Sequence, residues 1–379
     1  MDPVETQMLS ALELLHYGNR FRGQLFALYL DDEIELSDII TDLRVMQAAQ
    51  IKVIIFCSHY STLAAEIEEW NLRGTRMRYF QQVDEGEVSG SRSGLLRDAL
   101  RTEITPVIAL EEPQVKELTS APAVPTPRER QFQLLALNAA ERLHASKFFI
   151  VAPVRGLEVD GSLQSHPSSA EVQAFLGGTA KLNIGIEQLA FIHEQNVKRG
   201  IEIVLLEGKP GVLFQEVFSH RGKGTLFTKD YPNIVRRGRL SDVMDLAILM
   251  KPNISAGVLL PITEDEIAKE IEKFFLYTVN GAVVAASKLV DYGEAAELAK
   301  FTTLPRYQGR GRAKQLATLM IDEAKALGKK FVFSLSIEPK MWQFFLGLGF
   351  EEVSREELPL EWQQGYNLSR PSKAFRMYL

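Results

Sequence analysis

Cysteine is nearly absent from this sequence, which contains only Cys57 in 379 residues. A single cysteine excludes an intrachain disulfide framework and a zinc site built from several thiolates. The six histidines are scattered without the spacing of metal ligands, so we expect no metal site. A chain with so little cysteine is typical of a reducing compartment, and we expect a cytoplasmic protein.

Long apolar runs and a surplus of basic residues are also missing. Apolar runs such as residues 148–153 are far shorter than the roughly 20 residues that span a bilayer. Acidic residues, with no basic segment, precede the first apolar run, so we expect neither a signal peptide nor a membrane partner. The net charge of -6 argues against a nucleic-acid partner, which requires a basic surface.

The chain does have the length and the 46% hydrophobic content of two domains. In its first part, apolar β-rich runs alternate with helical patterns, which predicts a parallel α/β sheet. The predicted strands are residues 24–30, 51–57, 105–110, 148–152 and 201–206. A stretch rich in proline, glutamate and threonine, residues 112–130, is predicted to be a long loop. The pattern of alternating strands and helices changes after residues 221–233, which predicts domains 1–230 and 231–379.

The second part has the pattern of a mixed α/β domain. Asn280-Gly281 favours a type I′ turn and predicts a hairpin of residues 275–279 and 282–289. Before this hairpin we predict an edge strand at 234–237 and helices at 240–250 and 264–275. After it we predict a strand at 297–304, a helix at 313–327, a strand at 331–336, a helix at 340–348 and a strand at 374–378.

The most informative segment is residues 301–313, where a strand enters a glycine-rich turn that opens onto a long helix. A helix N-terminus presents N–H groups without helical partners and the positive end of the helix dipole. Glycine lets the backbone approach a phosphate closely, and Arg306, Arg310 and Arg312 add positive charge. A structural turn with basic residues would have the same local pattern.

Gln308-x-x-Gly311-x-Ala313 resembles the Q/R-x-x-G-x-G/A acetyl-CoA motif of the Gcn5-related N-acetyltransferase (GNAT) superfamily. The later Phe344-Phe345-x-x-x-Gly349-Phe350 matches the same superfamily, and the resemblance covers residues 233–379. It implies acetyl-CoA as the co-substrate. The residues implied in acetyl-CoA binding are Phe301, Thr302, Thr303, Gln308, Gly309, Arg310, Gly311, Arg312 and Ala313. Backbone N–H groups of residues 301–303 would polarise the thioester carbonyl.

Other segments resemble the N-acetylglutamate synthase family more closely. They are the stretch from Phe218 to Thr225, the stretch from Ile234 to Asp242, and Tyr366-Asn367-x-x-Arg370-x-Ser372-Lys373 near the end. The resemblance implies acetyl transfer to the α-amine of glutamate for arginine biosynthesis. It also implies a homo-oligomer with a small-molecule amino-acid substrate.

Phe21-Arg22-Gly23-Gln24 and the strand–helix–strand pattern that follows through Cys57 resemble the opening of the amino-acid kinase fold, a parallel-sheet sandwich. The kinase turns expected at residues 30–32 and 57–59 contain no glycine, and Asp31 and Asp32 would repel phosphate. We therefore expect a non-catalytic domain that regulates or oligomerises the protein. The resemblance implies an arginine effector near Tyr17, Glu216 and Gly224, and the alternative is that these residues simply close the domain.

Glu297 occupies the family's general-base position and would act through a water, although an edge salt bridge is the alternative. Ser336 matches a serine near the thiol, and the alternative is a hydroxyl bonded to backbone. Many GNAT enzymes have a tyrosine where this chain has Phe345, and the synthases lack it too.

Arg370 and Ser372 match residues that bind the substrate carboxylates, because the arginine fork pairs well with them. The family arginine after the Gly-x-Leu segment is replaced by Ile262, and Lys300 is the candidate substitute. Strict strand alternation would place Glu297 and Lys300 on opposite faces. We hypothesise a β-bulge that brings both to one face.

Two other functions remain open. The Ile262 substitution is compatible with an acetyltransferase for another amino acid or a small amine. The degenerate kinase turns are compatible with a non-catalytic sensor that binds acetyl-CoA and an amino acid. Turnover on a panel of amines distinguishes these functions.

Overall fold

The computed structural model describes residues 3–58, 63–81, 91–110, 128–219, 222–228, 234–279, 282–309, 311–367 and 369–379. The chain divides into two compact units, Tyr17–Asp230 and a unit that joins Met1–His16 to Tyr231–Leu379. The sequence predicts domains 1–230 and 231–379. The structure instead groups residues 1–16 with residues 231–379. Within that unit, His16 of helix α1 (Pro3–Phe21) pairs with Asp245 at 2.8 Å.

The unit Tyr17–Asp230 is built on a seven-stranded sheet in the order β3-β4-β2-β1-β5-β8-β9. Its strands are β1 (Leu25–Leu30), β2 (Lys52–Cys57), β3 (Met77–Gln81), β4 (Thr105–Ala109), β5 (Lys147–Ala152), β8 (Glu202–Glu207) and β9 (Thr225–Phe227). All neighbours are parallel except β8 and β9. Every residue of β1 is buried, which explains why these strands form continuous apolar runs in the sequence.

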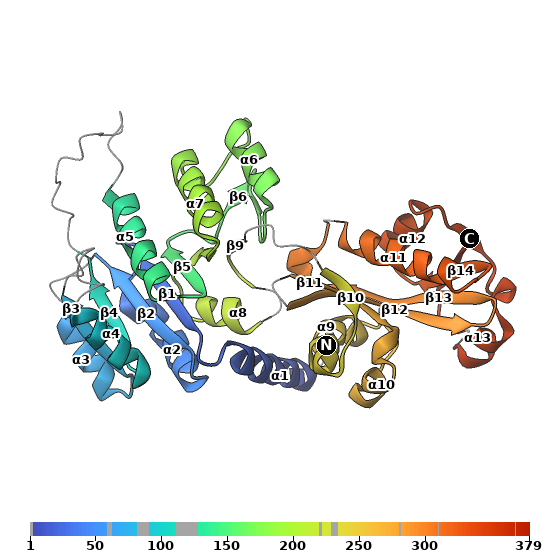
Figure 1. Ribbon diagram of the computed structural model, residues 1–379, viewed down its shortest axis with the longest axis horizontal. Helices are drawn as coiled ribbons and strands as arrows, with labels where there is room; N and C mark the ends of the chain where they lie inside the picture. The colour runs from blue at the N-terminus through green and yellow to red at the C-terminus, as the bar shows by residue number, and fades with distance from the viewer. Residues whose placement is uncertain are drawn as a thin grey trace. The chain divides into compact units, whose positions relative to one another are not determined.

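Helices cover both faces of this sheet, with α5 and α7 on one side and α2 and α8 on the other (Figure 1). The helices are α2 (Leu36–Ala48), α3 (Leu63–Leu72), α4 (Ser91–Arg101), α5 (Arg128–Arg142), α6 (Ser169–Gly177), α7 (Ile186–Arg199) and α8 (Val212–Phe218). A short hairpin, β6 (Glu158–Val159) and β7 (Ser162–Leu163), lies between β5 and α6. The Asp42 carboxylate of α2 accepts hydrogen bonds from the N–H groups of Gly211 and Phe214, which joins α2 to the start of α8.

The other unit contains a seven-stranded sheet in the order β10-β11-β12-β13-β14-β16-β15. Its strands are β10 (Ile234–Arg237), β11 (Phe274–Val279), β12 (Ala282–Tyr292), β13 (Ala295–Thr303), β14 (Phe331–Ser336), β15 (Glu351–Val353) and β16 (Lys373–Tyr378). The predicted hairpin is present as β11 and β12, where Val279 pairs with Ala282. Most neighbours are antiparallel, and β13 and β14 are parallel. The predicted fold class, a parallel-sheet sandwich followed by a mixed α/β domain, is confirmed.

Helices pack on both faces of the second sheet, with α9 and α10 opposite α11 and α12 (Figure 1). The helices are α9 (Val243–Ser255), α10 (Glu264–Lys269), α11 (Arg312–Ala326), α12 (Pro339–Leu346) and α13 (Leu360–Gly365). Short 3-10 turns lie at Leu240–Asp242, Ile271–Lys273, Pro305–Tyr307 and Arg355–Glu357.

We call the two faces of the second sheet the α9 face and the α11 face, after the longest helix that packs on each. Thr302 Oγ1 donates a hydrogen bond to the Leu249 carbonyl of α9, so Thr302 lies on the α9 face. Its pairing partner Ala286 lies on the same face, and so does Lys288, two residues further along β12. Lys288, Val290, Tyr292, Glu297 and Ala299 therefore belong to the α9 face. Leu289 and Leu298 belong to the α11 face, where they join the hydrophobic core with Leu316 and Met320.

Candidate active site

The predicted phosphate-binding turn leads directly into α11. Gly309 and Gly311 have φ values of 78° and 71°, in the left-handed region that favours glycine. A Cβ at either position would meet no atom within 4 Å, so the turn is open on that side. The first helical bond runs from Gln315 N–H to the Gly311 carbonyl at 3.0 Å. Earlier N–H groups, including that of Ala313, have no acceptor within the helix, so the turn fits a pyrophosphate group.

Arg312 uses its side chain differently from the expectation that its charge faces the phosphates. The side chain is buried, and Nη1 donates a hydrogen bond to the Tyr307 carbonyl at 2.9 Å. Its guanidinium lies over the rings of Tyr277 and Tyr307, 5.5 and 5.0 Å from their centres. The cation therefore holds the turn in place from inside. Arg310 lies outside the described residues.

The strands β13 and β14 diverge next to this turn. Their parallel pairing extends only from Ala295 to Glu297 on β13. One further link follows, from Ser334 Oγ to the Leu298 carbonyl at 2.6 Å. Among the described residues, no ladder pair joins the rest of β13 to β14, so a gap opens beside residues 299–303. Gln308 closes the far end of this strand by donating from Nε2 to the Thr303 carbonyl at 3.1 Å.

The side chains of Phe301 and Thr302 pack on opposite faces of the sheet. The Phe301 ring contacts Phe344 and Phe345, with centroid distances of 5.7 and 5.8 Å. Thr302 Oγ1 accepts a hydrogen bond from Asn253 Nδ2 at 2.8 Å. Because both side chains are used for packing, any role with a bound thioester falls to their backbone N–H groups.

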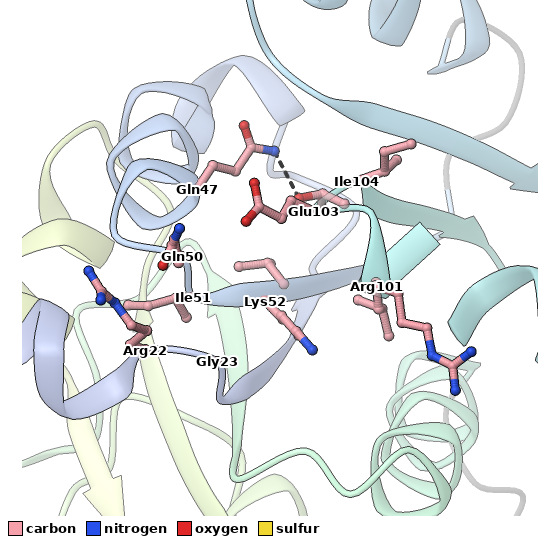
Figure 2. Close-up of a pocket in the computed structure, with 12 residues that line it drawn as sticks. Arg22, Gly23, Gln47, Gln50, Ile51, Lys52, Arg101, Glu103 and Ile104 are labelled. Atoms are coloured by element: carbon pink, nitrogen blue, oxygen red, sulfur yellow. Dashed lines mark hydrogen bonds between the residues drawn. The ribbon is translucent and has the colours of Figure 1, made fainter. Parts of the chain in front are cut away.

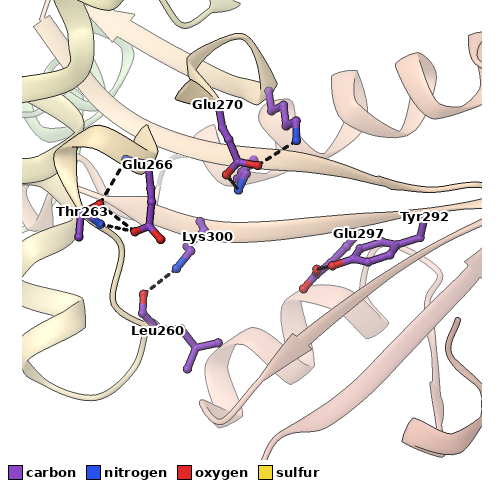
Figure 3. Close-up of polar contacts among 9 residues, drawn as sticks. Leu260, Thr263, Glu266, Glu270, Tyr292, Glu297 and Lys300 are labelled. Carbon is purple, nitrogen blue, oxygen red and sulfur yellow. Dashed lines mark hydrogen bonds and ion pairs between the residues drawn. The ribbon is translucent and has the colours of Figure 1, made fainter. Parts of the chain in front are cut away.

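Glu297 lies on the α9 face, at the point where β13 and β14 begin to separate. Tyr292 donates a hydrogen bond from its hydroxyl to Glu297 Oε2 at 3.4 Å (Figure 3). Burial raises the pKa of Glu297 to about 7, although the charge of Lys288, the hydrogen bond from Tyr292 and the charge of Lys300 act in the opposite direction. A carboxylate with a pKa near neutrality is well matched to general-base chemistry.

The expected β-bulge is present, and Lys300 is part of it. Lys288 pairs with Ala299, whereas Ala286 pairs with Thr302, so β13 has one more residue than β12 in this interval. Lys300 has a φ of 58°, an uncommon value for a lysine. Its Nζ donates to the Leu260 carbonyl at 2.6 Å (Figure 3). Burial, followed by the charge of Lys288, lowers the pKa of Lys300 to about 8.

Arg370 reaches the same loop as Lys300. Its Nη2 donates to the carbonyls of Gly257, at 2.8 Å, and Val258. Ser372 is buried, and its Oγ accepts a hydrogen bond from the Tyr366 hydroxyl at 3.0 Å. Two cations from distant parts of the sequence therefore bind carbonyl groups of residues 257–260, and no carboxylate among the described residues forms a salt bridge with either.

Ser336 lies at the end of β14, where its Oγ accepts a hydrogen bond from Glu338 N–H at 3.0 Å. This contact matches the structural alternative, a hydroxyl bonded to backbone, and leaves the hydroxyl hydrogen to point elsewhere. Phe345 is buried against Phe350 and Phe375 and offers no acid at the position where other GNAT enzymes have tyrosine.

Two residues of this site, Lys288 and Tyr292, were not predicted from the sequence. The expected hairpin strand ended at residue 289, whereas β12 extends to Tyr292. Their relation to Glu297 depends on the register between β12 and β13, in which Val290 pairs with Glu297. Alternation along β12 was the available signal, but the register that gives it meaning is a tertiary property.

The predicted effector residues lie in the unit Tyr17–Asp230. Glu216 Oε2 accepts hydrogen bonds from the N–H groups of Lys223 and Gly224, at 2.6 and 2.9 Å. A Cβ at Gly224 would come within 2.3 Å of the Leu205 carbonyl oxygen, so this close approach requires glycine. Tyr17 stacks on Phe21 with a centroid distance of 6.1 Å. These contacts match the reading in which the residues close the domain, and arginine binding stays a prediction.

The same unit has a cavity of about 170 Å³ at the amino ends of its strands. Arg22, Lys52 and Arg101 line it together with Gln47 and Glu103 (Figure 2). Gln47 is already bonded to the Thr105 hydroxyl at 2.9 Å. The cavity includes none of the three predicted effector residues.

Residues 261–358 match the family model described as an acetyltransferase (GNAT) domain. The C-terminal part of the chain is a GNAT acetyltransferase domain. This confirms the resemblance inferred from the turn at residues 308–313. The match spans the bulge, the separation of β13 from β14 and the start of α11, so these features belong to the GNAT domain.

Curated relatives extend the similarity beyond the GNAT domain. The amino-acid acetyltransferase of Pseudomonas aeruginosa is 29% identical over 251 residues, which cover 65% of this chain and 57% of the relative. The amino-acid acetyltransferase of Pseudomonas syringae is 32% identical over 247 residues, 64% of this chain and 56% of the relative. The chain thus spans less than two thirds of the length of these relatives.

A solved structure shares the fold of nearly the whole chain. N-acetylglutamate synthase from Neisseria gonorrhoeae, complexed with coenzyme A and L-arginine, is similar with a TM-score of 0.59 and 18% identity. The similarity covers 97% of this chain and 98% of that protein. It supports the same order of folds, an α/β unit followed by the GNAT domain.

In the described part of the chain, no group of three or more histidine, cysteine, aspartate or glutamate residues could hold a metal ion. Within the same residues, no helix combines the length and apolar character needed to cross a bilayer.

Proposed function

We propose that this chain is an amino-acid N-acetyltransferase that uses acetyl-CoA to acetylate the α-amine of L-glutamate. The observation that carries the proposal is the bulge at Lys300, which places a lysine where its charge acts on the Glu297 carboxylate, beside the gap between β13 and β14. An amino-acid acceptor needs a base for its amine and a cation for its carboxylate. The names of the curated relatives and of the solved synthase support the same chemistry.

The turn before α11 is assigned to acetyl-CoA binding. The N–H groups of Gly311, Arg312 and Ala313 would receive the pyrophosphate, because the turn is open and the helix dipole favours an anion there. Gln308 and Gly309 shape this turn. Bound acetyl-CoA supplies the acetyl group as a thioester.

The reaction needs a proton acceptor, an oxyanion site and a proton donor. Glu297 takes a proton from the substrate ammonium through a water, and the amine nitrogen then bonds to the acetyl carbon as the C–S bond breaks. N–H groups of Phe301, Thr302 and Thr303 stabilise the negative charge on the acetyl oxygen. We assign Ser336 to proton transfer to the leaving group: its hydroxyl proton goes to the departing thiolate, and the proton that the attacking nitrogen loses as the amide forms restores the hydroxyl.

Lys300 and Arg370 are assigned to the substrate carboxylates, with Ser372 beside them. In the structure both cations bind neutral carbonyls of residues 257–260. A carboxylate forms stronger, charge-assisted hydrogen bonds than a carbonyl, so a substrate can replace these contacts. Once Lys300 and Arg370 bind substrate in place of these carbonyls, the two cations together favour an acceptor with two carboxylates.

A different amino acid is the second candidate acceptor. Ile262, at the position of the family arginine, packs against the hydrophobic core and offers no charge. Its apolar side chain favours an acceptor with a less charged side chain than glutamate. The chemistry at Glu297 would be the same.

We further propose that the unit Tyr17–Asp230 is a non-catalytic, regulatory part of a cytoplasmic homo-oligomer. The support is its fold, which is shared with a synthase that was solved with L-arginine. Arginine would act near Glu216 and Gly224.

Release of coenzyme A from acetyl-CoA, measured across the twenty amino acids with and without arginine, tests the proposal. Turnover restricted to glutamate supports a synthase, and turnover on another amino acid supports the second candidate. Glu297→Gln is the control for enzyme-catalysed transfer. Binding of acetyl-CoA without release on any amino acid would contradict both.

A further inference from the structure

Strand β12 presents two side chains to Glu297 from opposite directions. Val290 pairs with Glu297, so Lys288 and Tyr292 are its diagonal neighbours on the α9 face. The Tyr292 hydroxyl donates a hydrogen bond to the Glu297 carboxylate, and its ring packs on Phe333 with a centroid distance of 5.6 Å. The phenol is thus fixed by packing on one side of the carboxylate.

Lys288 lies on the other side and is a buried cation with 8% of its surface exposed. Its ammonium forms an ion pair with Glu270, which also bonds to Lys273 at 2.9 Å. Burying a charge costs stability that an apolar side chain of similar volume would not cost. A positive charge at this position therefore suggests a role beyond packing.

We propose that Lys288 and Tyr292 are positioning residues that hold the Glu297 carboxylate ionised and correctly oriented, the lysine by its charge and the tyrosine by its hydrogen bond. This inference rests on the proposed function in one respect, which is that Glu297 is the base. We call the two residues the β12 bracket.

The charged surroundings of Glu297 agree with the β12 bracket. Burial is the main cause that raises the pKa of Glu297, and Lys288, Tyr292 and Lys300 each lower it. Lys288 also lowers the pKa of Lys300 through repulsion between the two ammonium groups. The outer charges are Glu270 and Glu361 near Tyr292, and Glu266 and Arg370 near Lys300.

The pH dependence of kcat/KM tests whether the β12 bracket holds Glu297 ionised. In Tyr292→Phe the acid limb moves upward by about one pH unit, because the carboxylate loses a hydrogen bond, and the basic limb stays in place. In Lys288→Met both limbs move upward, because the lysine charge acts on Glu297 and on Lys300. Lys288→Arg keeps the charge and the wild-type limbs. Lys273→Met, which removes the other cation on Glu270, is the matched control and leaves both limbs unchanged.

A purely structural role has a different signature. It would lower activity equally at every pH while both limbs stayed at their wild-type positions, and that result would overturn the proposal. Tyr292→Phe removes a single oxygen atom, so the test remains decisive if Lys288→Met folds poorly.

A second measurement does not depend on turnover. Carbon-13 NMR of protein labelled at glutamate carboxyl groups gives the titration midpoint of Glu297, identified by the signal that disappears in Glu297→Gln. An upward shift in Tyr292→Phe supports the β12 bracket, and an unchanged midpoint overturns it. If the shift is seen and wild-type protein acetylates no amino acid, the proposed function fails, while the effect of the β12 bracket on the ionisation of Glu297 stands.

Discussion

The pKa values of Glu297 and Lys300 lie close together because both side chains are partly removed from water. Burial raises the pKa of Glu297 to about 7 and lowers that of Lys300 to about 8. The proposed reaction needs an ionised Glu297 and a charged Lys300. At the residue scale, the active form of the site therefore exists in a narrow range of pH.

This range predicts the pH dependence of the wild-type protein. Below about pH 7 kcat/KM falls because Glu297 becomes protonated, and above about pH 8 the KM of the amino acid rises because Lys300 loses its charge. Steady-state kinetics at a series of pH values measure both limbs. An acid limb near 4.5, the ordinary pKa of glutamate, would contradict the burial effect.

Replacing Lys300 tests its role as a carboxylate ligand. Lys300→Met keeps the β-carbon, so the backbone strain at its φ of 58° is unchanged. We expect KM for the amino acid to rise roughly 10- to 100-fold, as for a lost charged hydrogen bond of about 1.5–3 kcal/mol. Lys269→Met, at an exposed lysine of α10, is the control for a general loss of positive charge. An equal rise in both variants would argue against direct binding.

At the element scale, the glycines before and after α11 share a left-handed backbone conformation but differ in their proposed roles. Gly311 precedes the helix with a φ of 71°, and Gly328 follows it with a φ of 72°. A Cβ at either glycine would meet no atom within 4 Å. Alanine at either position should therefore cost the same amount, on the order of 1–2 kcal/mol of strain.

Only one of these substitutions should weaken acetyl-CoA binding. Gly311→Ala places strain in the turn whose N–H groups we propose as the pyrophosphate site, so we expect its Kd for acetyl-CoA to rise about tenfold. Gly328→Ala should lower the melting temperature by a similar amount and leave the Kd unchanged. Calorimetry of both variants measures the difference, and equal Kd values would remove the turn from the binding site.

At the scale of the whole molecule, Glu216 stabilises the unit Tyr17–Asp230, whereas the turn that we propose for acetyl-CoA binding belongs to the other unit. Glu216→Ala leaves the buried Gly224 N–H without its carboxylate, and we expect a loss of about 1–3 kcal/mol in the free energy of unfolding. Acetyl-CoA should still stabilise the variant as much as the wild type. Urea denaturation with and without acetyl-CoA tests both statements, with Glu194→Ala on the exposed face of α7 as the control. A smaller ligand effect in the variant would mean that Glu216 also influences the GNAT domain.

Local patterns determined much of this protein from sequence alone. The glycine-rich turn before α11, the Asn280-Gly281 hairpin and the alternation of strands and helices each depend on neighbouring residues, whose backbone preferences are intrinsic. The single cysteine likewise excluded a disulfide framework without any structure.

The tertiary structure decided where the site residues lie and what they contact. The register of β12 against β13 placed Lys288 and Tyr292 beside Glu297, and one extra residue in β13 turned Lys300 toward the loop of residues 257–260. Arg312 belongs to a motif that the sequence identified, yet burial between two tyrosine rings turned its charge inward. Pairing and burial join residues that are distant in the sequence, so no local preference specifies them.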